Sequence, residues 1–358
     1  MGRTTETVSF SDVLAEGVTP GDEPPLRLAV ISTPRSGNTW VRALLARLYD
    51  LVELPVHFPQ QLDWEALPRR CVIQLHWYPE ESFTATLERA GVRVVVLARH
   101  PLDVLISWLN YSYYVHQEGV CPGKEACDKC DILGVSPRSD ALIDYAGGRV
   151  GHWLLSHSPA WWNRDGVLHA RYEDLVAEPE VALGRLLDEI GERPRQPIAQ
   201  VLEATSIHQM KPSKDAWAFH YWQGRPGLWR SLITAEVARA IAAGRPEPFE
   251  VLGYSCDPDE SLGDTEADLN WLRLQLDSTR ENLAVASAKH SKRLEELGCE
   301  RMLRAKAEEQ LGQVQQTLDE TLRTLAEKET LLEAADARLE SMKQTSIRIP
   351  RFLISRAN

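Results

Sequence analysis

The sequence predicts an α/β domain, in which helices cover both faces of a parallel sheet, followed by a long α-helical coiled coil. Apolar runs at residues 28–32 and 92–98 are typical of buried parallel strands. Segments with helical periodicity separate such runs, which favours a parallel sheet between layers of helices. From Leu269 onward leucine recurs every seven residues, the spacing of a coiled-coil seam.

Changes in composition suggest how the 358 residues are divided. We expect a loose N-terminal arm at residues 1–25, an α/β domain at 26–260, a cysteine-containing insertion at about 116–140, a coiled coil at 264–346 and a short basic and apolar tail at 347–358. Within the domain we expect strands at residues 28–32, 72–75, 92–98 and 167–170, and a helix over 147–162 whose tryptophans belong to the core.

Charge and hydropathy exclude some classes of function. A formal net charge of -12 argues against nucleic acid as the main partner. There is no run of eighteen apolar residues, so we expect no transmembrane helix. The N-terminus lacks the apolar core of a signal peptide, and Glu6 stands where a myristoylation motif has Ser or Thr. We therefore expect a cytoplasmic protein.

The sequence STPRSGNTW at residues 32–40 predicts an anion-binding loop. It links the first strand to a helix marked by Trp40, Val41 and Leu44. The first backbone N–H groups of a helix and its dipole attract a negatively charged group, and Arg35 adds a full positive charge. The loop does not match the nucleotide-triphosphate pattern GxxxxGK(S/T).

A second segment, RHPLDVLIS at residues 99–107, follows the strand at residues 92–98. Pro101 and Asp103 suit the first turn of a helix. Arg99 leaves the carboxyl end of a strand, where ligands bind in open α/β sheets. Ser107 lies two turns into the helix and is expected to face back toward Arg99.

Five motifs in this order resemble those of the cytosolic-type sulfotransferases, which use 3'-phosphoadenosine 5'-phosphosulfate (PAPS). The resemblance covers roughly the first 260 residues and implies the P-loop-like fold of that family. The matching segments are residues 32–40 (family TYPKSGTTW), 99–107 (RNPxDVxxS), 170–175 (YEDL), 204–211 (TSFxxMK) and 224–230 (RKGxxGDWK).

The resemblance implies an enzyme that moves a sulfuryl group from PAPS to a hydroxyl or amine of a glycan, lipid or small molecule. The product would be adenosine 3',5'-bisphosphate (3',5'-ADP). Negative charge spreads over the sulfonate and the leaving phosphate in such a transfer, so cations, N–H donors and a base are needed. The chemistry does not in itself require a metal.

The same resemblance implies a role for each matching residue. Arg35 would stabilise the transferring group and hold the 5'-phosphate. The contacts to the donor would come from Ser36, Gly37, Asn38 and Thr39 in the loop, from Trp40, Tyr172, Thr205 and Ile207 around the adenine, and from Arg99, Ser107, Gly224 and Arg225 around the 3'-phosphate.

His76 is the candidate general base. It follows the strand ending at Leu75 and precedes Trp77 and Tyr78, much as the family's KTHLP places its histidine. A histidine at a strand's carboxyl end suits deprotonation of an alcohol. We expect the acceptor to bind near His76, between Trp77–Tyr78 and the segment at residues 108–114.

Three departures from the family pattern bear on activity. Arg35 replaces the loop lysine, and a guanidinium does not hand over a proton in practice. Gln74 replaces a lysine two residues before His76. Trp222 and Gln223 replace an arginine and a lysine, for which Arg225 would compensate.

Several alternatives remain open. His116, Cys121, Cys127 and Cys130 would make a four-ligand zinc site, but a loop of free thiols, or a disulfide in an oxidising compartment, suits the same spacing. The leucine repeat, broken at His290 and Arg304, fits a homo-oligomer, a partner protein or a single solvated helix. The rival functions are a small-molecule kinase and an inactive nucleotide-binding domain that serves a coiled-coil assembly.

Overall fold

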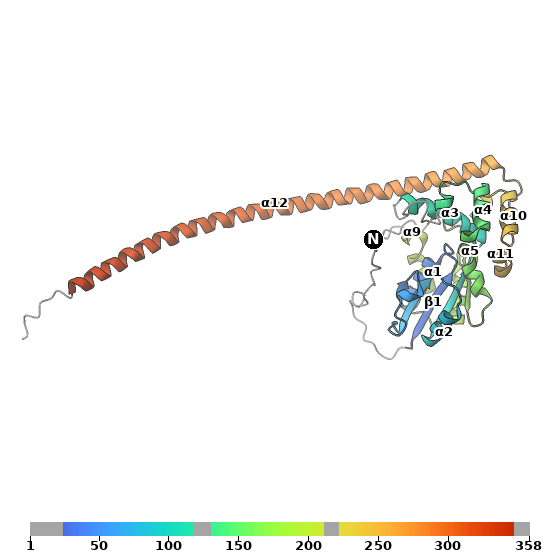
Figure 1. Ribbon diagram of the computed structural model, residues 1–358, viewed down its shortest axis with the longest axis horizontal. Helices are drawn as coiled ribbons and strands as arrows, with labels where there is room; N and C mark the ends of the chain where they lie inside the picture. The colour runs from blue at the N-terminus through green and yellow to red at the C-terminus, as the bar shows by residue number, and fades with distance from the viewer. Residues whose placement is uncertain (1–23, 118–129, 211–221, 347–358) are drawn as a thin grey trace, which may run out of the picture. The chain divides into compact units, whose positions relative to one another are not determined.

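The computed structural model describes residues 24–117, 130–210 and 222–346, and it contains a parallel sheet of five strands (Figure 1). The strand order is β2-β3-β1-β4-β5. The strands are β1 (Leu26–Ser32), β2 (Val52–Pro55), β3 (Arg70–Leu75), β4 (Val92–Ala98) and β5 (Leu168–Arg171). The predicted fold class is confirmed for the sheet and for a long C-terminal helix.

Alternate side chains of the sheet enter two separate cores. Leu28 and Val30 of β1 face α1 (Asn38–Tyr49), α7 (Pro179–Ile190) and α8 (Ile198–Ala204), whereas Ala29 and Ile31 face α2 (Glu81–Arg89) and α5 (Arg149–Trp162). Burial on both faces explains why these strands read as continuous apolar runs. β2 was not predicted, because its sequence VELP is short and alternates between half-buried and exposed positions.

The strand order creates a crevice at the carboxyl ends of β1 and β4. The chain leaves β1 toward β2 on one side, and it leaves β4 toward β5 on the other. Ser32 pairs with Leu97 and Ile31 with Leu75, so the strands beside β1 end level with it. Ligands of open α/β sheets bind at such a switch point.

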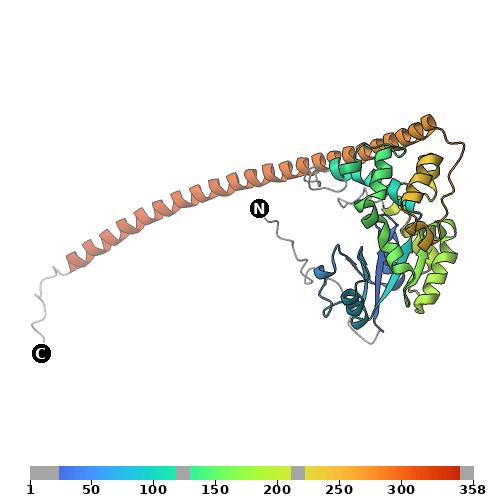
Figure 2. The same ribbon diagram turned by 45° about the vertical axis from the view of Figure 1, so that its right-hand side comes forward.

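A helical layer beside the sheet packs around a third core (Figure 2). Its elements are α3 (Pro101–Gln117), α4 (Asp140–Gly147), part of α5, α10 (Ala235–Gly244) and α11 (Glu247–Leu252). Shorter elements are η2 (Pro59–Gln61), η4 (Cys130–Ile132), α6 (Tyr172–Ala177), α9 (Ile207–Met210) and η6 (Leu228–Ser231). Trp161 is buried as expected, but Trp153 is 42% exposed and therefore does not belong to the core.

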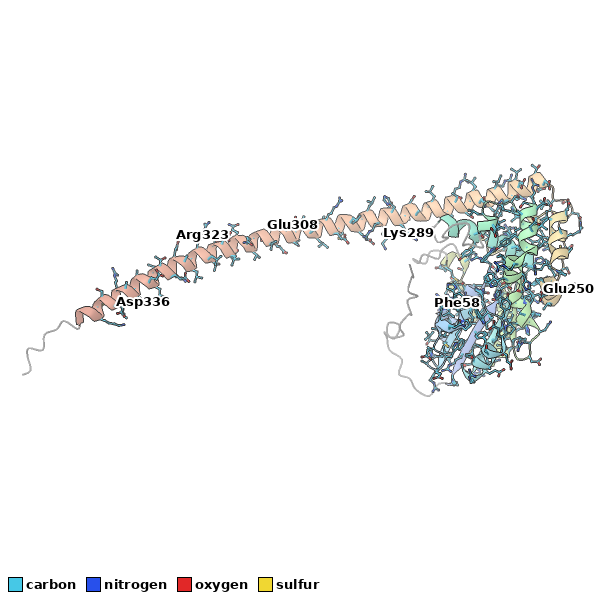
Figure 3. All side chains as sticks on the ribbon, in the orientation of Figure 1. Phe58, Glu250, Lys289, Glu308, Arg323 and Asp336 are labelled. Atoms are coloured by element: carbon cyan, nitrogen blue, oxygen red, sulfur yellow. The ribbon has the colours of Figure 1, made fainter. Side chains whose placement is uncertain are left out.

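The last helix, α12 (Asp264–Ser346), is 83 residues long. The chain separates into two compact units, Met1–Ser278 and Thr279–Asn358, so α12 begins within the first unit. Beyond Ser278 its charged side chains, including Lys289, Glu308 and Arg323, project from the helix on several sides (Figure 3). No described helix has both the length and the apolar character needed to cross a membrane.

Candidate active site

The loop between β1 and α1 has a backbone shaped for an anion. Arg35 and Gly37 have positive φ angles of 68° and 99°, and the helix begins at Asn38, two residues earlier than predicted. The Asn38 side chain is occupied within the loop, because it accepts a hydrogen bond from Ser32 Oγ and donates to Thr33 O. Trp40 N and Val41 N donate to Gly37 O, so the N–H groups of Asn38 and Thr39 are the natural donors to a ligand in the first turn of α1.

Ser158 of α5 fixes the start of this loop. Its hydroxyl donates to Leu97 O of β4 at 2.7 Å and accepts from Thr33 N at 2.8 Å. Its own N–H donates to Thr33 Oγ1 at 3.1 Å. Thr33 and Ser158 are 125 positions apart, and no sequence pattern links them, so this anchor was not predicted.

The Arg35 side chain turns toward helix α3. Its Nε donates to Ser107 Oγ at 3.2 Å, and its guanidinium lies 4.7 Å from the centroid of the Tyr111 ring. Burial, with a smaller contribution from the nearby Arg99 cation, lowers the pKa of Arg35 to about 10, so it stays charged at neutral pH. Tyr111 was predicted only as part of the acceptor segment at residues 108–114, and its contact with Arg35 was not predicted, although it lies one helical turn beyond Ser107.

Arg99 lies on the other side of the loop. It donates from Nη1 to Arg35 O at 2.9 Å, and its guanidinium lies 4.4 Å from the centroid of the Tyr172 ring. Its Nε is buried and has no hydrogen-bond partner among the described residues, as is also true of Ser36 Oγ. Since buried polar atoms are normally satisfied, these two donors fit an anionic ligand in the crevice.

Tyr172 joins three of the predicted motifs. Its hydroxyl donates to Gly224 O at 3.0 Å, and its ring meets Trp40 edge-on at 6.0 Å. A Cβ atom on Gly37 would lie 2.6 Å from the Tyr172 ring. Gly37 is therefore required both by its left-handed backbone and by the close approach of this ring.

Replacing Gly37 by alanine is expected to destabilise the fold by more than the roughly 1–3 kcal/mol typical of strained backbone, because a clash is added. Gly166→Ala is the matched control, since Gly166 has a φ of 77° and open space around its Cβ position. Urea unfolding measures both variants. Equal losses of stability would show that the Tyr172 contact contributes nothing.

The remaining residues that were predicted to contact the donor have mixed geometry. Ile207 Cδ1 would be 3.0 Å from a Cβ on Gly224, so these two residues are neighbours. Thr205 is buried, but its hydroxyl donates to Val201 O of its own helix at 2.7 Å. Arg225 is exposed and forms no hydrogen bond or ion pair with another described residue.

Asp103 holds the last motif in place. Its carboxylate accepts hydrogen bonds from Gly227 N at 2.6 Å and from Trp229 N at 3.1 Å, so the helix after Arg99 is tied to residues 224–230. Glu173 has a similar bridging role, since it accepts from His100 N and from the Tyr254 hydroxyl. Glu173 therefore joins the segment that follows β4 to Tyr254.

His76 lies at the end of β3 with a defined tautomer. Its Nδ1 lies 2.6 Å from Ser32 O, and a carbonyl oxygen can only accept, so Nδ1 carries the proton. Burial lowers the pKa of His76 to about 4 despite this hydrogen bond. The ring is therefore neutral at pH 7, with a free lone pair on Nε2.

A series of rings in contact connects the surroundings of His76 to those of Arg35. His157 of α5 lies 6.3 Å from His76, stacks on Tyr78 at 4.5 Å and meets Trp153 edge-on at 5.1 Å. The series continues from Trp153 to Trp108 at 6.3 Å and from Trp108 to Tyr111 at 5.6 Å. His157 was not singled out from the sequence.

The two buried histidines predict acid sensitivity. Burial lowers the pKa of His157 to about 3 and that of His76 to about 4, against an ordinary value of 6.5. As the pH falls from 6.5 toward 3, the unfolded chain takes up protons that the folded chain resists, so stability falls. His157→Gln should flatten this dependence in urea unfolding between pH 4 and 7. His169→Gln is the control, because the His169 side chain is exposed. If stability falls with pH as steeply in His157→Gln as in His169→Gln, the prediction is contradicted.

The zinc hypothesis lies outside the described residues, because Cys121 and Cys127 and the side chains of His116 and Cys130 are not described. Within residues 24–117, 130–210 and 222–346 no three His, Cys, Asp or Glu side chains are placed to hold a metal ion.

Comparisons with known proteins agree with the motifs. The chain is 24% identical over 252 residues to sulfotransferase 1A1 of Canis lupus familiaris, a match that covers 63% of this chain and 79% of the relative. It is 27% identical over 191 residues to cytosolic sulfotransferase 15 of Arabidopsis thaliana, covering 44% and 49% of the two chains. The structure of mouse sulfotransferase SULT7A1 complexed with PAP is 18% identical, covers 63% of this chain and 84% of that one, and has a TM-score of 0.49.

The sequence pattern described as "Sulfotransferase domain" matches residues 25–243, which is more than half of the chain. That match includes the loop between β1 and α1, His76, Arg99 and Tyr172. This chain therefore belongs to the sulfotransferase domain family.

Proposed function

We propose that this chain transfers a sulfuryl group from PAPS to a hydroxyl or amine of an acceptor. The observation that supports it best is the arrangement of Arg35, Arg99 and His76 after neighbouring strands. Beside them lie two buried donors, Ser36 Oγ and Arg99 Nε, that have no hydrogen-bond partner in the part of the chain that the structure describes. Two cations and a neutral base in one crevice suit a reaction that builds negative charge and releases a proton.

The two arginines divide the donor between them. The first turn of α1 and Arg35 hold the 5' end, and Arg99 with the segment after Gly224 holds the 3'-phosphate. Ser107 was predicted at the 3'-phosphate, but its oxygen accepts a hydrogen bond from Arg35, which holds the 5' end. Ser107 therefore links the residues at the two ends of the donor. The adenine lies against Trp40, Tyr172 and Ile207, with Thr205 contributing its methyl group because its hydroxyl is already engaged.

His76 accepts the proton of the acceptor on Nε2. Its Nδ1–H bond to Ser32 O keeps Nε2 free and fixes the plane of the ring. Arg35 stabilises the negative charge on the transferring group by its field and its N–H donors, and it keeps its own proton. Bound PAPS supplies an activated sulfonate with adenosine 3',5'-bisphosphate as the leaving group.

Thermal unfolding with ligands tests this function against its rivals. A rise in melting temperature with adenosine 3',5'-bisphosphate but not with ATP and Mg²⁺ supports the sulfotransferase. A rise with ATP and Mg²⁺ alone supports a small-molecule kinase, and no rise with either supports an inactive assembly protein. Acceptors are then screened among glycans, lipids and small molecules with labelled donor.

We propose further that the acceptor binds along the ring series between His76 and Arg35. Aromatic faces bind sugars, phenols and apolar ring systems alike. Trp153 is its exposed member and lies between His157 and Trp108. Trp153→Ala should therefore raise the KM for the acceptor and leave the affinity for adenosine 3',5'-bisphosphate unchanged.

We also propose that α12 pairs with a second copy of this chain through its later leucines. Leu311, Leu318, Leu325, Leu332 and Leu339 keep the seven-residue spacing without a break, and all are 49–67% exposed. Such a row of exposed apolar side chains is typical of an unpaired coiled-coil seam. Light scattering of the full chain should give a dimer, and Leu318→Glu with Leu325→Glu should give a monomer, whereas the off-seam control Glu327→Gln should remain dimeric. A monomer in every sample would rule out self-association.

A further inference from the structure

The last motif contains a tryptophan where the family has an arginine, and its side chain points toward helix α12. Trp222 Nε1 donates to Ser278 Oγ at 2.9 Å. Its ring meets that of Trp271 edge-on, with centroids 6.2 Å apart. Trp222 therefore binds the beginning of α12 instead of offering a charge to a ligand.

The first turns of α12 are a fixed part of the folded domain. Ala267, Trp271 and Ser278 are 1%, 6% and 6% exposed, and their spacing places them on one face of the helix. Asn270 Nδ2 donates to Ser231 O at 3.1 Å. The family match ends at residue 243, so this docked segment lies outside the matched residues.

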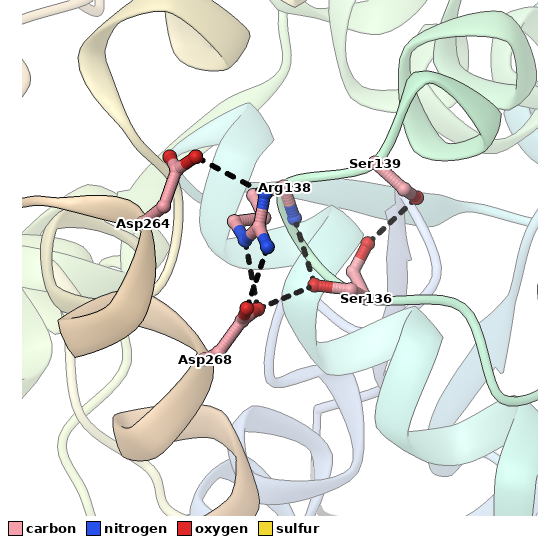
Figure 4. Close-up of polar contacts among 5 residues, drawn as sticks. All are labelled: Ser136, Arg138, Ser139, Asp264 and Asp268. Carbon is pink, nitrogen blue, oxygen red and sulfur yellow. Dashed lines mark hydrogen bonds and ion pairs between the residues drawn. The ribbon is translucent and has the colours of Figure 1, made fainter.

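Arg138 fastens the N-terminal end of α12 (Figure 4). It donates from Nε and Nη2 to the two oxygens of Asp268 at 2.9 and 2.6 Å, and from Nη1 to Asp264 at 3.3 Å. Ser136 Oγ donates to the same Asp268 carboxylate at 3.1 Å. A two-pronged arginine–carboxylate pair defines orientation as well as distance, so the helix enters the domain in one register.

Three anchors hold the segment from Trp222 to Gly227. Ser278 holds Trp222, Tyr172 holds Gly224 through its carbonyl, and Asp103 holds Gly227 through its N–H. The Tyr172 ring in turn lies against the guanidinium of Arg99. A shift of Trp222 must therefore pass through only one residue, Gln223, before it reaches Gly224, the partner of the Tyr172 hydroxyl.

We propose that Trp222 is a positioning residue, through which the docked start of α12 sets the geometry of residues 222–227 and hence the affinity for the nucleotide 3'-phosphate. This inference rests on the proposed function. It gives the appended helix a role in donor binding that is separate from any pairing of its later leucines.

Isothermal titration of the full chain with two nucleotides tests the proposal. Trp222→Phe keeps an aromatic ring but removes the donor, and Ser278→Ala removes the acceptor. Each substitution should weaken the binding of adenosine 3',5'-bisphosphate by about three- to tenfold, the range for one lost hydrogen bond. The affinity for 5'-AMP, which lacks the 3'-phosphate, should stay unchanged. The double variant should lose little more than either single one.

Ser287→Ala, an exposed serine farther along the same helix, is the matched control and should bind both nucleotides like the wild type. Unchanged bisphosphate affinity in Trp222→Phe and Ser278→Ala would overturn the proposal, and so would an equal loss for 5'-AMP, which marks a general structural effect. Failure of the wild-type chain to bind the bisphosphate would instead overturn the proposed function.

Discussion

His76→Ala is expected to lower turnover by about 10²–10⁴-fold, the usual contribution of a general base, while leaving the affinity for adenosine 3',5'-bisphosphate unchanged. The reason is that the imidazole Nδ1 contacts Ser32 O at the end of β1, and in the proposed mechanism Nε2 accepts the proton of the acceptor and does not contact PAPS. Turnover with labelled PAPS and titration with the bisphosphate measure the two quantities separately.

The pH dependence of the wild type gives an independent check of the same residue. The pKa of His76 is lowered to about 4, so Nε2 takes up a proton only as the pH falls through that value. The acid limb of kcat/KM should therefore lie near pH 4 rather than near the ordinary histidine value of about 6.5. Near-normal turnover in His76→Ala, with that limb intact, would move the role to His57, His116 or a carboxylate such as Glu80.

Arg35→Ala is expected to lower turnover by about 10²–10³-fold, the effect of removing a group that stabilises developing negative charge. The substitution should also weaken the binding of adenosine 3',5'-bisphosphate, because Arg35 lies between Ser107 and Arg99 in the proposed donor site. Steady-state kinetics and titration measure the two losses.

Arg35→Lys tests what the guanidinium adds. A lysine restores the charge, but it lacks the planar fork that contacts Ser107 and covers the Tyr111 ring. We expect only partial recovery of turnover. Arg42→Ala is the control for a general loss of positive charge, since Arg42 pairs with Glu53 and Gln74. Turnover of Arg35→Ala within threefold of the Arg42→Ala control would refute the role of Arg35.

Local sequence predicted those parts of the site that lie at the ends of strands. The apolar runs before Arg35, His76 and Arg99 defined three neighbouring strands, and parallel strands bring their carboxyl ends to one edge. The short strand β2 was not predicted, because an edge strand that contains Glu53 and Pro55 lacks a continuous apolar run.

Contacts between segments that are distant in the sequence could not be predicted in this way. Ser158 reaches Thr33, and Trp222 reaches Ser278, through tertiary packing that leaves no periodic trace in the sequence. The direction of a side chain was equally hidden. Ser107 was expected to face Arg99, but its hydroxyl oxygen accepts a hydrogen bond from Arg35 instead.

The hydrogen bond from Arg99 to the main-chain oxygen of Arg35 has a consequence for the thermodynamics of ligand binding. Together with the Ser158 contacts, it orders the loop before any nucleotide arrives, so the conformational entropy of the loop is lost during folding and not on association. Binding should therefore be dominated by the exchange of water for phosphate oxygens. Amide hydrogen exchange at Thr33 and Ser36, whose N–H groups donate to Ser158 Oγ and Thr33 O, should accordingly be slow in the free protein and change little when the nucleotide is added.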